Sequence, residues 1–114
     1  MNIMCNDLTL FSQGTLICKD PHKIEFELEE GVFVQFKFKT TQEEEKKVES
    51  HVVDGRLEVV FYNFNNPLGT AVASMSVGKI GKTQYILSAS VYSVGENGSS
   101  IKTVHYNWYK KEIA

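Results

Sequence analysis

The chain has 114 residues, of which 42% are hydrophobic and 23% are charged. This composition is ordinary for a soluble globular protein, so it argues against wholesale disorder and predicts one domain spanning residues 1–114. The formal net charge of −2 gives no general attraction to nucleic acid or to anionic lipid, and neither is an expected partner.

The N-terminal segment shows no recognisable targeting signal. Residues 1–7 lack a basic segment and a long apolar run, and no stretch of about 20 apolar residues occurs in the chain. Cys5 and Cys18 are too few for a disulfide framework, so free thiols are expected. We therefore predict a cytoplasmic protein without a membrane-spanning segment.

Two short apolar runs near the N-terminus, Leu8–Phe11 and Thr15–Lys19, lie on either side of Gly14. They predict either a small hairpin or one strand that is kinked by a bulge at the glycine, and the sequence leaves both alternatives open. Pro21 then interrupts the sheet, because proline cannot donate to a strand ladder.

Apolar and polar side chains alternate over residues 24–29 and again over residues 32–39, which is the pattern of two half-buried strands. The two apolar sets face the same side only if Leu28 pairs with Val32. This register leaves a three-residue loop, 29–31, with Gly31 in the left-handed position of a bulged hairpin.

A second hairpin is predicted around Asp54-Gly55, after a charged segment, 42–47, that is expected to form a loop or one helical turn. An X-Gly pair between apolar runs favours a two-residue type I′ turn, whose twist matches that of the strands. The turn fixes the register, and the inward pairs are then Val52 with Leu57, Ser50 with Val59 and Val48 with Phe61.

The turn-rich segment 63–69 precedes another strand, whose inward side chains are expected to be Ala71, Ala73, Met75 and Val77. A last hairpin follows, with Asn97-Gly98 as its turn. Its register places three pairs on the inner face, Val91 with Val104, Ala89 with Tyr106 and Leu87 with Trp108. The opposite face carries Ser90 with His105 and Ser88 with Asn107.

These segments predict about eight to nine short strands with turn signals every 8–12 residues. The pattern is typical of an all-β protein, and we expect a meander-rich antiparallel β-sandwich with at least one longer connection. A small β-barrel is the alternative.

Three motifs suggest phosphate binding, metal binding or catalysis, but none of them has all the residues that the function requires. Residues 78–83 resemble a phosphate loop, but a Walker A motif needs four residues between its glycines and a helix after them. The three histidines have no partners at metal-ligand spacing. His105 shares a predicted face with Ser88 and Ser90, yet no orienting acid or nucleophile elbow accompanies them. We therefore assign no catalytic residue, no metal and no cofactor.

Five aromatic side chains fall on the outward parity of their strands and form either a second buried layer or an exposed strip: Tyr62, Phe64, Tyr85, Tyr92 and Tyr109. The leading hypothesis is a non-catalytic domain that binds a protein partner, or a second copy of itself, through a sheet edge or an aromatic sheet face. The alternative hypothesis is a small-ligand or carbohydrate-binding β-domain. The candidate binding residues are Tyr62, Tyr92, His105 and Tyr109.

Three segments of the second half carry a resemblance: residues 63–69, the turn from Val77 to Gly81, and Val104–Tyr109. Together they resemble a family of small, uncharacterised all-β domains in bacteria. The resemblance implies a compact β-domain of unknown function. It implies no activity and assigns no functional residue.

Overall fold

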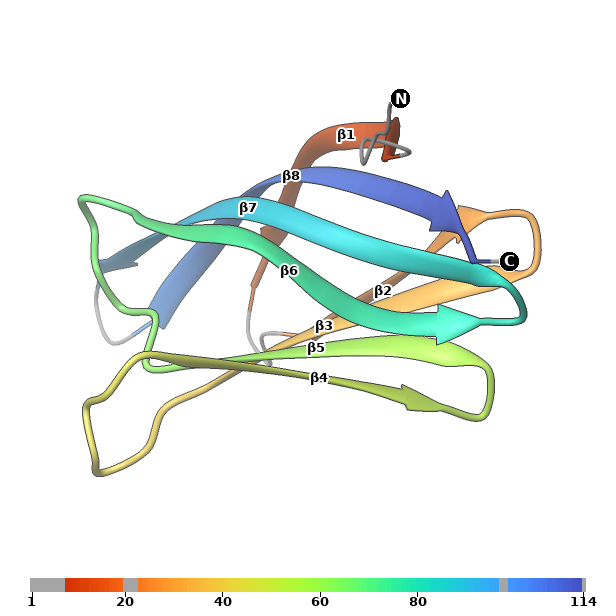
Figure 1. The fold of residues 1–114 in the computed structure, drawn as a ribbon. Coiled ribbons are helices and arrows are strands. Elements are labelled where there is room, and N and C mark those ends of the chain that lie inside the picture. The colour runs from red at the N-terminus through yellow and green to blue at the C-terminus, as the bar shows by residue number, and fades with distance from the viewer. Residues whose placement is uncertain (1–7, 20–22, 97–98, 114) are drawn as a thin grey trace.

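The computed structural model describes residues 8–19, 23–96 and 99–113. These residues form eight strands and no helix (Figure 1). The strands are β1 (Thr9–Cys18), β2 (Lys23–Glu29), β3 (Val32–Lys39), β4 (Lys47–Val53), β5 (Arg56–Tyr62), β6 (Thr70–Ile80), β7 (Thr83–Glu96) and β8 (Ser99–Glu112).

The strands form two four-stranded sheets that lie one over the other (Figure 1). Sheet A has the order β1-β8-β7-β6, and sheet B has the order β2-β3-β5-β4. The predicted all-β sandwich is confirmed with eight strands, and the described strands do not close into a barrel.

One strand pair differs from the predicted antiparallel arrangement. β3 and β5 run parallel, with Phe36 beside Val59, whereas the other paired strands are antiparallel. Because β4 lies at the edge of sheet B, residues 40–46 carry the chain past β5 before the β4–β5 hairpin returns it beside β3. This crossover brings the 40–46 loop to the end of the sandwich where β5 also ends (Figure 1).

Two hairpins have the registers that their X-Gly turns predict. In the β4–β5 hairpin, Asp54 and Gly55 both have positive φ, as a type I′ turn requires. The predicted pairs of this hairpin are confirmed, and so are those of the β7–β8 hairpin, whose turn residues 97–98 lie outside the described residues.

The β2–β3 hairpin forms as predicted along its strands but differs from the prediction at its turn. Gly31 has the expected positive φ of 80°. Val32 pairs with Glu29, however, so the predicted pairing of Leu28 with Val32 is wrong. An irregularity between Glu27 and Glu29 takes up the extra residue, and Leu28 stays buried.

The N-terminal segment is one strand, which decides between the two alternatives. Its register shifts between Leu10 and Ser12, so the bulge is not at Gly14 as expected. A Cβ atom on Gly14 would lie 2.9 Å from the Tyr106 hydroxyl oxygen. The glycine therefore makes room for an aromatic ring rather than bending the strand.

The face assignment of β6 is partly wrong. Two register irregularities, between Val72 and Met75 and between Ser76 and Gly78, change which side chains point inward. Ala71 and Ala73 are exposed, contrary to prediction, and Val72 packs against the core instead.

The core lies between the two sheets and consists mainly of aromatic and branched side chains. Trp108 of sheet A stacks on Phe36 of sheet B with ring centroids 6.3 Å apart. Two of the five aromatic side chains predicted to point outward, Phe64 and Tyr85, are buried. Tyr85 has the inward parity of Leu87 in the regular β7 ladder, and Phe64 lies beyond the end of β5. Each fully buried side chain of this size contributes about 1.5–3 kcal/mol. The residues with almost no solvent exposure are Cys18, Val34, Phe36, Leu57, Val59, Phe61, Leu87, Val91, Val104 and Trp108.

A polar cluster links the two sheets at the end of β2. The Tyr85 hydroxyl donates a hydrogen bond of 2.5 Å to Glu29, and the Lys110 ammonium donates one of 2.6 Å. Lys110 also lies 4.7 Å from the centroid of the Phe11 ring. Burial alone would raise the pKa of Glu29, but the hydrogen bonds from Lys110 and Tyr85 outweigh it and the pKa falls below its usual value.

Replacing Glu29 by Gln removes the charge that these two donors bind. We expect the free energy of unfolding near neutral pH to fall by about 1.5–3 kcal/mol, the usual contribution of hydrogen bonds to a charged group. Because folding lowers the pKa of Glu29, the stabilisation is complete above the unfolded-state pKa of about 4.3 and is lost as the pH falls below it. Denaturant titrations across this pH range measure both effects.

Glu30→Gln is the matched control, because Glu30 is the exposed neighbour in the turn. It should change neither the stability nor its dependence on pH. The same pH profile for Glu29→Gln and the native protein would contradict the role assigned to Glu29.

Candidate functional site

The outer face of sheet A carries a group of exposed apolar side chains, called here the apolar patch. Its members are Ile17 (57% exposed), Tyr92 (37%), Val94 (56%) and Ile101 (39%). Strand pairing places them side by side, because Thr103 pairs with both Ile17 and Tyr92, and Val94 pairs with Ile101. Contiguous exposed apolar groups of this kind are typical of interaction sites.

Tyr92 is held in place from two sides. Its ring centroid lies 5.5 Å from that of His105, at an interplanar angle of 80°. On another side it packs against Gly69, where a Cβ atom would lie 2.5 Å from the Tyr92 ring. His105 is fixed in turn by a 2.9 Å hydrogen bond between its Nδ1 atom and the Thr15 hydroxyl. The patch therefore presents a preorganised aromatic side chain.

The structure brings two of the four predicted binding residues together and separates the other two. Tyr92 and His105 are neighbours in sheet A. Tyr109 lies further along the same face, beside Ile86 and Leu10. Tyr62 belongs to sheet B, where its hydroxyl donates a 3.1 Å hydrogen bond to Glu49.

His105 does not have the surroundings of a catalytic base. Its hydrogen-bonding partner is Thr15, not Ser88 or Ser90, and no described carboxylate bonds to the imidazole. In the described part of the chain, no three His, Cys, Asp or Glu side chains gather where they would hold a metal ion. The described residues also include no helix that is long and apolar enough to cross a membrane.

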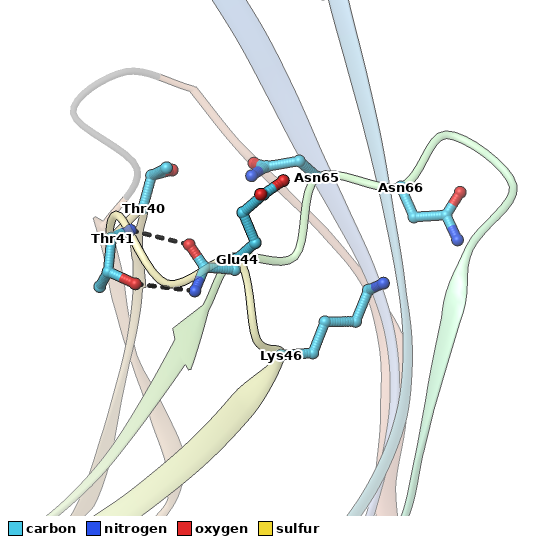
Figure 2. Close-up of a pocket in the computed structure, with 7 residues that line it drawn as sticks. Thr40, Thr41, Glu44, Lys46, Asn65 and Asn66 are labelled. Atoms are coloured by element: carbon cyan, nitrogen blue, oxygen red, sulfur yellow. Dashed lines mark hydrogen bonds between the residues drawn. The ribbon is translucent and has the colours of Figure 1, made fainter.

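A polar pocket of about 380 Å³ opens between the 40–46 loop and the connection 63–69 (Figure 2). The two segments are far apart in sequence and meet because of the β3–β5 crossover. The close-up shows Glu44 and Asn65 directed toward one another from the two walls. The residues that line the pocket are Thr40, Thr41, Glu44, Lys46, Asn63, Asn65 and Asn66.

Asn63 fixes the loop side of the pocket. It has a positive φ of 63°, and its buried side chain accepts a 2.7 Å hydrogen bond from the Thr41 N–H. The same amide donates to the Thr41 hydroxyl at 2.9 Å and to the Glu45 carbonyl at 2.8 Å (Figure 2 draws the two bonds to Thr41). All of its side-chain hydrogen bonds therefore hold the loop in one conformation.

Lys102 is buried and fixes the other wall of the pocket, the connection 63–69. Only 4% of this residue is exposed, and its ammonium donates hydrogen bonds to the Phe64 carbonyl, Asn65 Oδ1 and the Ser93 hydroxyl at 3.2, 2.9 and 2.9 Å. Burial lowers the pKa of Lys102. All three acceptors are neutral, and no described carboxylate forms an ion pair with it.

Several of these residues were not identified from the sequence. The predicted β7–β8 register already places Val94 and Ile101 on the outer face. It also places Lys102 at an inward position of β8, where a lysine is unusual. Both signals were present in the hairpin pattern. Ile17 and the pocket depend on contacts between distant segments, which no local pattern reveals.

Comparison with known families identifies the chain as a whole. Residues 2–111 match the family described as "Domain of unknown function (DUF6864)", and the chain belongs to this family. Comparisons with curated proteins and with solved structures gave no match. The match confirms the predicted membership of an uncharacterised family. Because the family has no assigned function, a proposed function rests on the geometry of this chain.

Asn63 provides a test of how the pocket wall is built. Asn63→Gly keeps the positive φ accessible and removes three side-chain hydrogen bonds, so we expect a loss of about 2–3 kcal/mol of unfolding free energy. Asn63→Ala should lose about 1 kcal/mol more, because a Cβ atom disfavours the left-handed region. Urea denaturation of both variants measures the difference. Native stability in Asn63→Gly would show that the three bonds do not hold the loop.

Proposed function

We propose that this member of the DUF6864 family is a non-catalytic protein-interaction domain that binds its partner through the outer face of sheet A. The observation that carries the proposal is the apolar patch, whose four side chains remain exposed on adjacent strands although the core is already complete. Tyr92, held between Gly69 and His105, is the expected anchor of the interface.

The sheet face is better suited to binding than the sheet edges. β6 contains two register irregularities, and the edge strands β1 and β2 contain one each. Such irregularities hinder the addition of another strand. The edge strand β4 is held against β6, since the Ser50 hydroxyl donates to the Ser76 carbonyl at 3.4 Å and Val52 packs against Gly78. The proposal therefore favours the face over the edge.

The size and chemistry of the face indicate what kind of surface it fits. Strands of 10, 14, 14 and 11 residues, spaced by about 4.8 Å and rising about 3.3 Å per residue, cover roughly 800 Å². A standard protein interface buries about that area on each partner. The patch and its neighbours Thr15, Ser90 and Thr103 carry no formal charge. The same face also carries Lys79 and Lys111, near the β6–β7 turn, so the patch and not the whole face fits an uncharged, apolar protein surface. A second copy of this domain offers such a surface in its own patch.

A second candidate function, small-ligand binding, is supported by the polar pocket. Its volume of about 380 Å³ is within the usual range for small-molecule sites. None of its lining residues is aromatic, so the pocket offers no stacking platform for a sugar ring. A small polar ligand therefore fits it better than a carbohydrate.

The proposal also includes a bacterial source and a cytoplasmic location. Two cysteines do not make a disulfide framework, and the structure shows Cys18 as a buried free thiol. Neither proposed function requires a metal or another cofactor.

The patch is tested by replacing its centre with small polar residues. Tyr92→Ser combined with Ile101→Ser should reduce partner binding more than tenfold, because buried aromatic anchors often contribute 2 kcal/mol or more. The two side chains are 37% and 39% exposed and Tyr92 also packs against Gly69 and His105, so the double variant should lose about 1–3 kcal/mol of unfolding free energy, and thermal unfolding checks that it remains folded. Quantitative capture from a lysate of the source cell measures binding to other proteins, and sedimentation velocity measures self-association.

Tyr62→Ser is the matched control, because Tyr62 is a tyrosine on the other sheet. It should retain the binding of the native protein. If the double variant captures the same proteins and sediments in the same way as the native protein, the patch is not an interface.

A further inference from the structure

The polar pocket contains two opposite charges that do not neutralise each other. Glu44 and Lys46, which precede and follow Glu45 in the 40–46 loop, both line the pocket. Neither forms an ion pair with the other or with any described residue. By contrast, Lys47, the next residue along the chain, is paired with Glu49 at 3.1 Å. The pocket thus offers a free carboxylate and a free ammonium within one small space.

The walls that carry these charges are held by buried polar side chains. Asn63 bonds to Thr41 and Glu45 on the loop side, and Lys102 bonds to Asn65 on the other side. A lysine buried among neutral acceptors is unfavourable unless its contacts are well made. Both anchors fix the walls of the pocket before any ligand arrives, which lowers the entropic cost of binding, while the Glu44 and Lys46 side chains that the walls carry are exposed.

The Asn66 amide and the Thr41 hydroxyl are hydrogen-bonded within the protein, and two other polar groups of the pocket are left to bind a ligand. Lys102 occupies the Asn65 carbonyl oxygen, so the Asn65 NH₂ group is left to donate. The Thr40 hydroxyl also lines the pocket and has no hydrogen bond to another described side chain. Amide and hydroxyl groups of this kind orient a polar ligand, while the two charges set its overall character.

We infer that the pocket binds a small zwitterion of the amino-acid class. The ligand's ammonium group faces the Glu44 carboxylate, and its carboxylate faces the Lys46 ammonium. This inference rests on the second candidate function, small-ligand binding, and is independent of the apolar patch. The apolar patch does not suit such a ligand, because the ligand's ammonium needs a protein carboxylate and its carboxylate needs a protein ammonium.

The test is an NMR titration of the full chain, labelled with ¹⁵N, against each free L-amino acid and a panel of monosaccharides at low salt. At least one amino acid should bind with a dissociation constant below about 1 mM and shift signals from residues 40–46 and 63–66. Two analogues of the best binder each lack one charge: the amine lacks the carboxylate, and the carboxylic acid lacks the ammonium. Each should bind about tenfold more weakly, since a charge-assisted hydrogen bond contributes about that factor.

Two variants that each remove one charge show which end of the ligand each residue binds. Glu44→Gln should weaken the amino acid about tenfold and leave the carboxylic acid unchanged, whereas Lys46→Gln should weaken the amino acid and leave the amine unchanged. Glu43→Gln is the control, because Glu43 is the neighbouring charge that does not line this pocket. It should bind the amino acid as the native protein does.

The outcomes separate this inference from the function on which it rests. If a monosaccharide shifts the pocket signals and no amino acid does, small-ligand binding stands and the zwitterion is excluded. Equal binding of the carboxylic acid and the amino acid also overturns the inference. If no compound shifts these signals at about 10 mM, both the inference and the second candidate function are wrong.

Discussion

The register of the β7–β8 ladder is the constraint on which the rest of the structure depends. Fourteen residue pairs, from Thr83 with Glu112 to Glu96 with Ser99, follow one another without an irregularity. This alternation places Trp108 in the core and Tyr92 on the outer face. A shift of one residue would exchange the two faces, exposing the tryptophan and burying the patch. The core and the proposed interface are therefore two sides of the same ladder.

The turn residues made the hairpin registers predictable from the sequence. The pairing of strands from different hairpins could not be predicted in this way. The Asp54-Gly55 turn has the positive φ values of its type, so the β4–β5 register followed from the sequence. The parallel pairing of β3 with β5 joins strands from different hairpins, and no turn residue encodes it. In β6 the irregularities change the period of two, and for this reason the inward assignment of Ala71 failed.

The candidate sites show the same division. Tyr92 and His105 share a face because the hairpin register requires it, whereas Tyr62 lies on the other sheet, an arrangement that alternation along one strand does not reveal. The pocket joins loops that only the crossover brings together. One connection links both sites: Asn66 lines the pocket, and its backbone carbonyl oxygen accepts a 3.3 Å hydrogen bond from the Ser93 N–H, next to Tyr92.

The proposed function requires that protein partners bind to the outer face of sheet A. The most direct measurement is photo-cross-linking in the source cell, with a photo-activatable phenylalanine analogue in place of Tyr92 or, on sheet B, in place of the exposed His51. We expect a defined protein adduct, with another protein or with a second copy, from position 92 and none from position 51. Adducts from position 51 together with none from position 92 would contradict it.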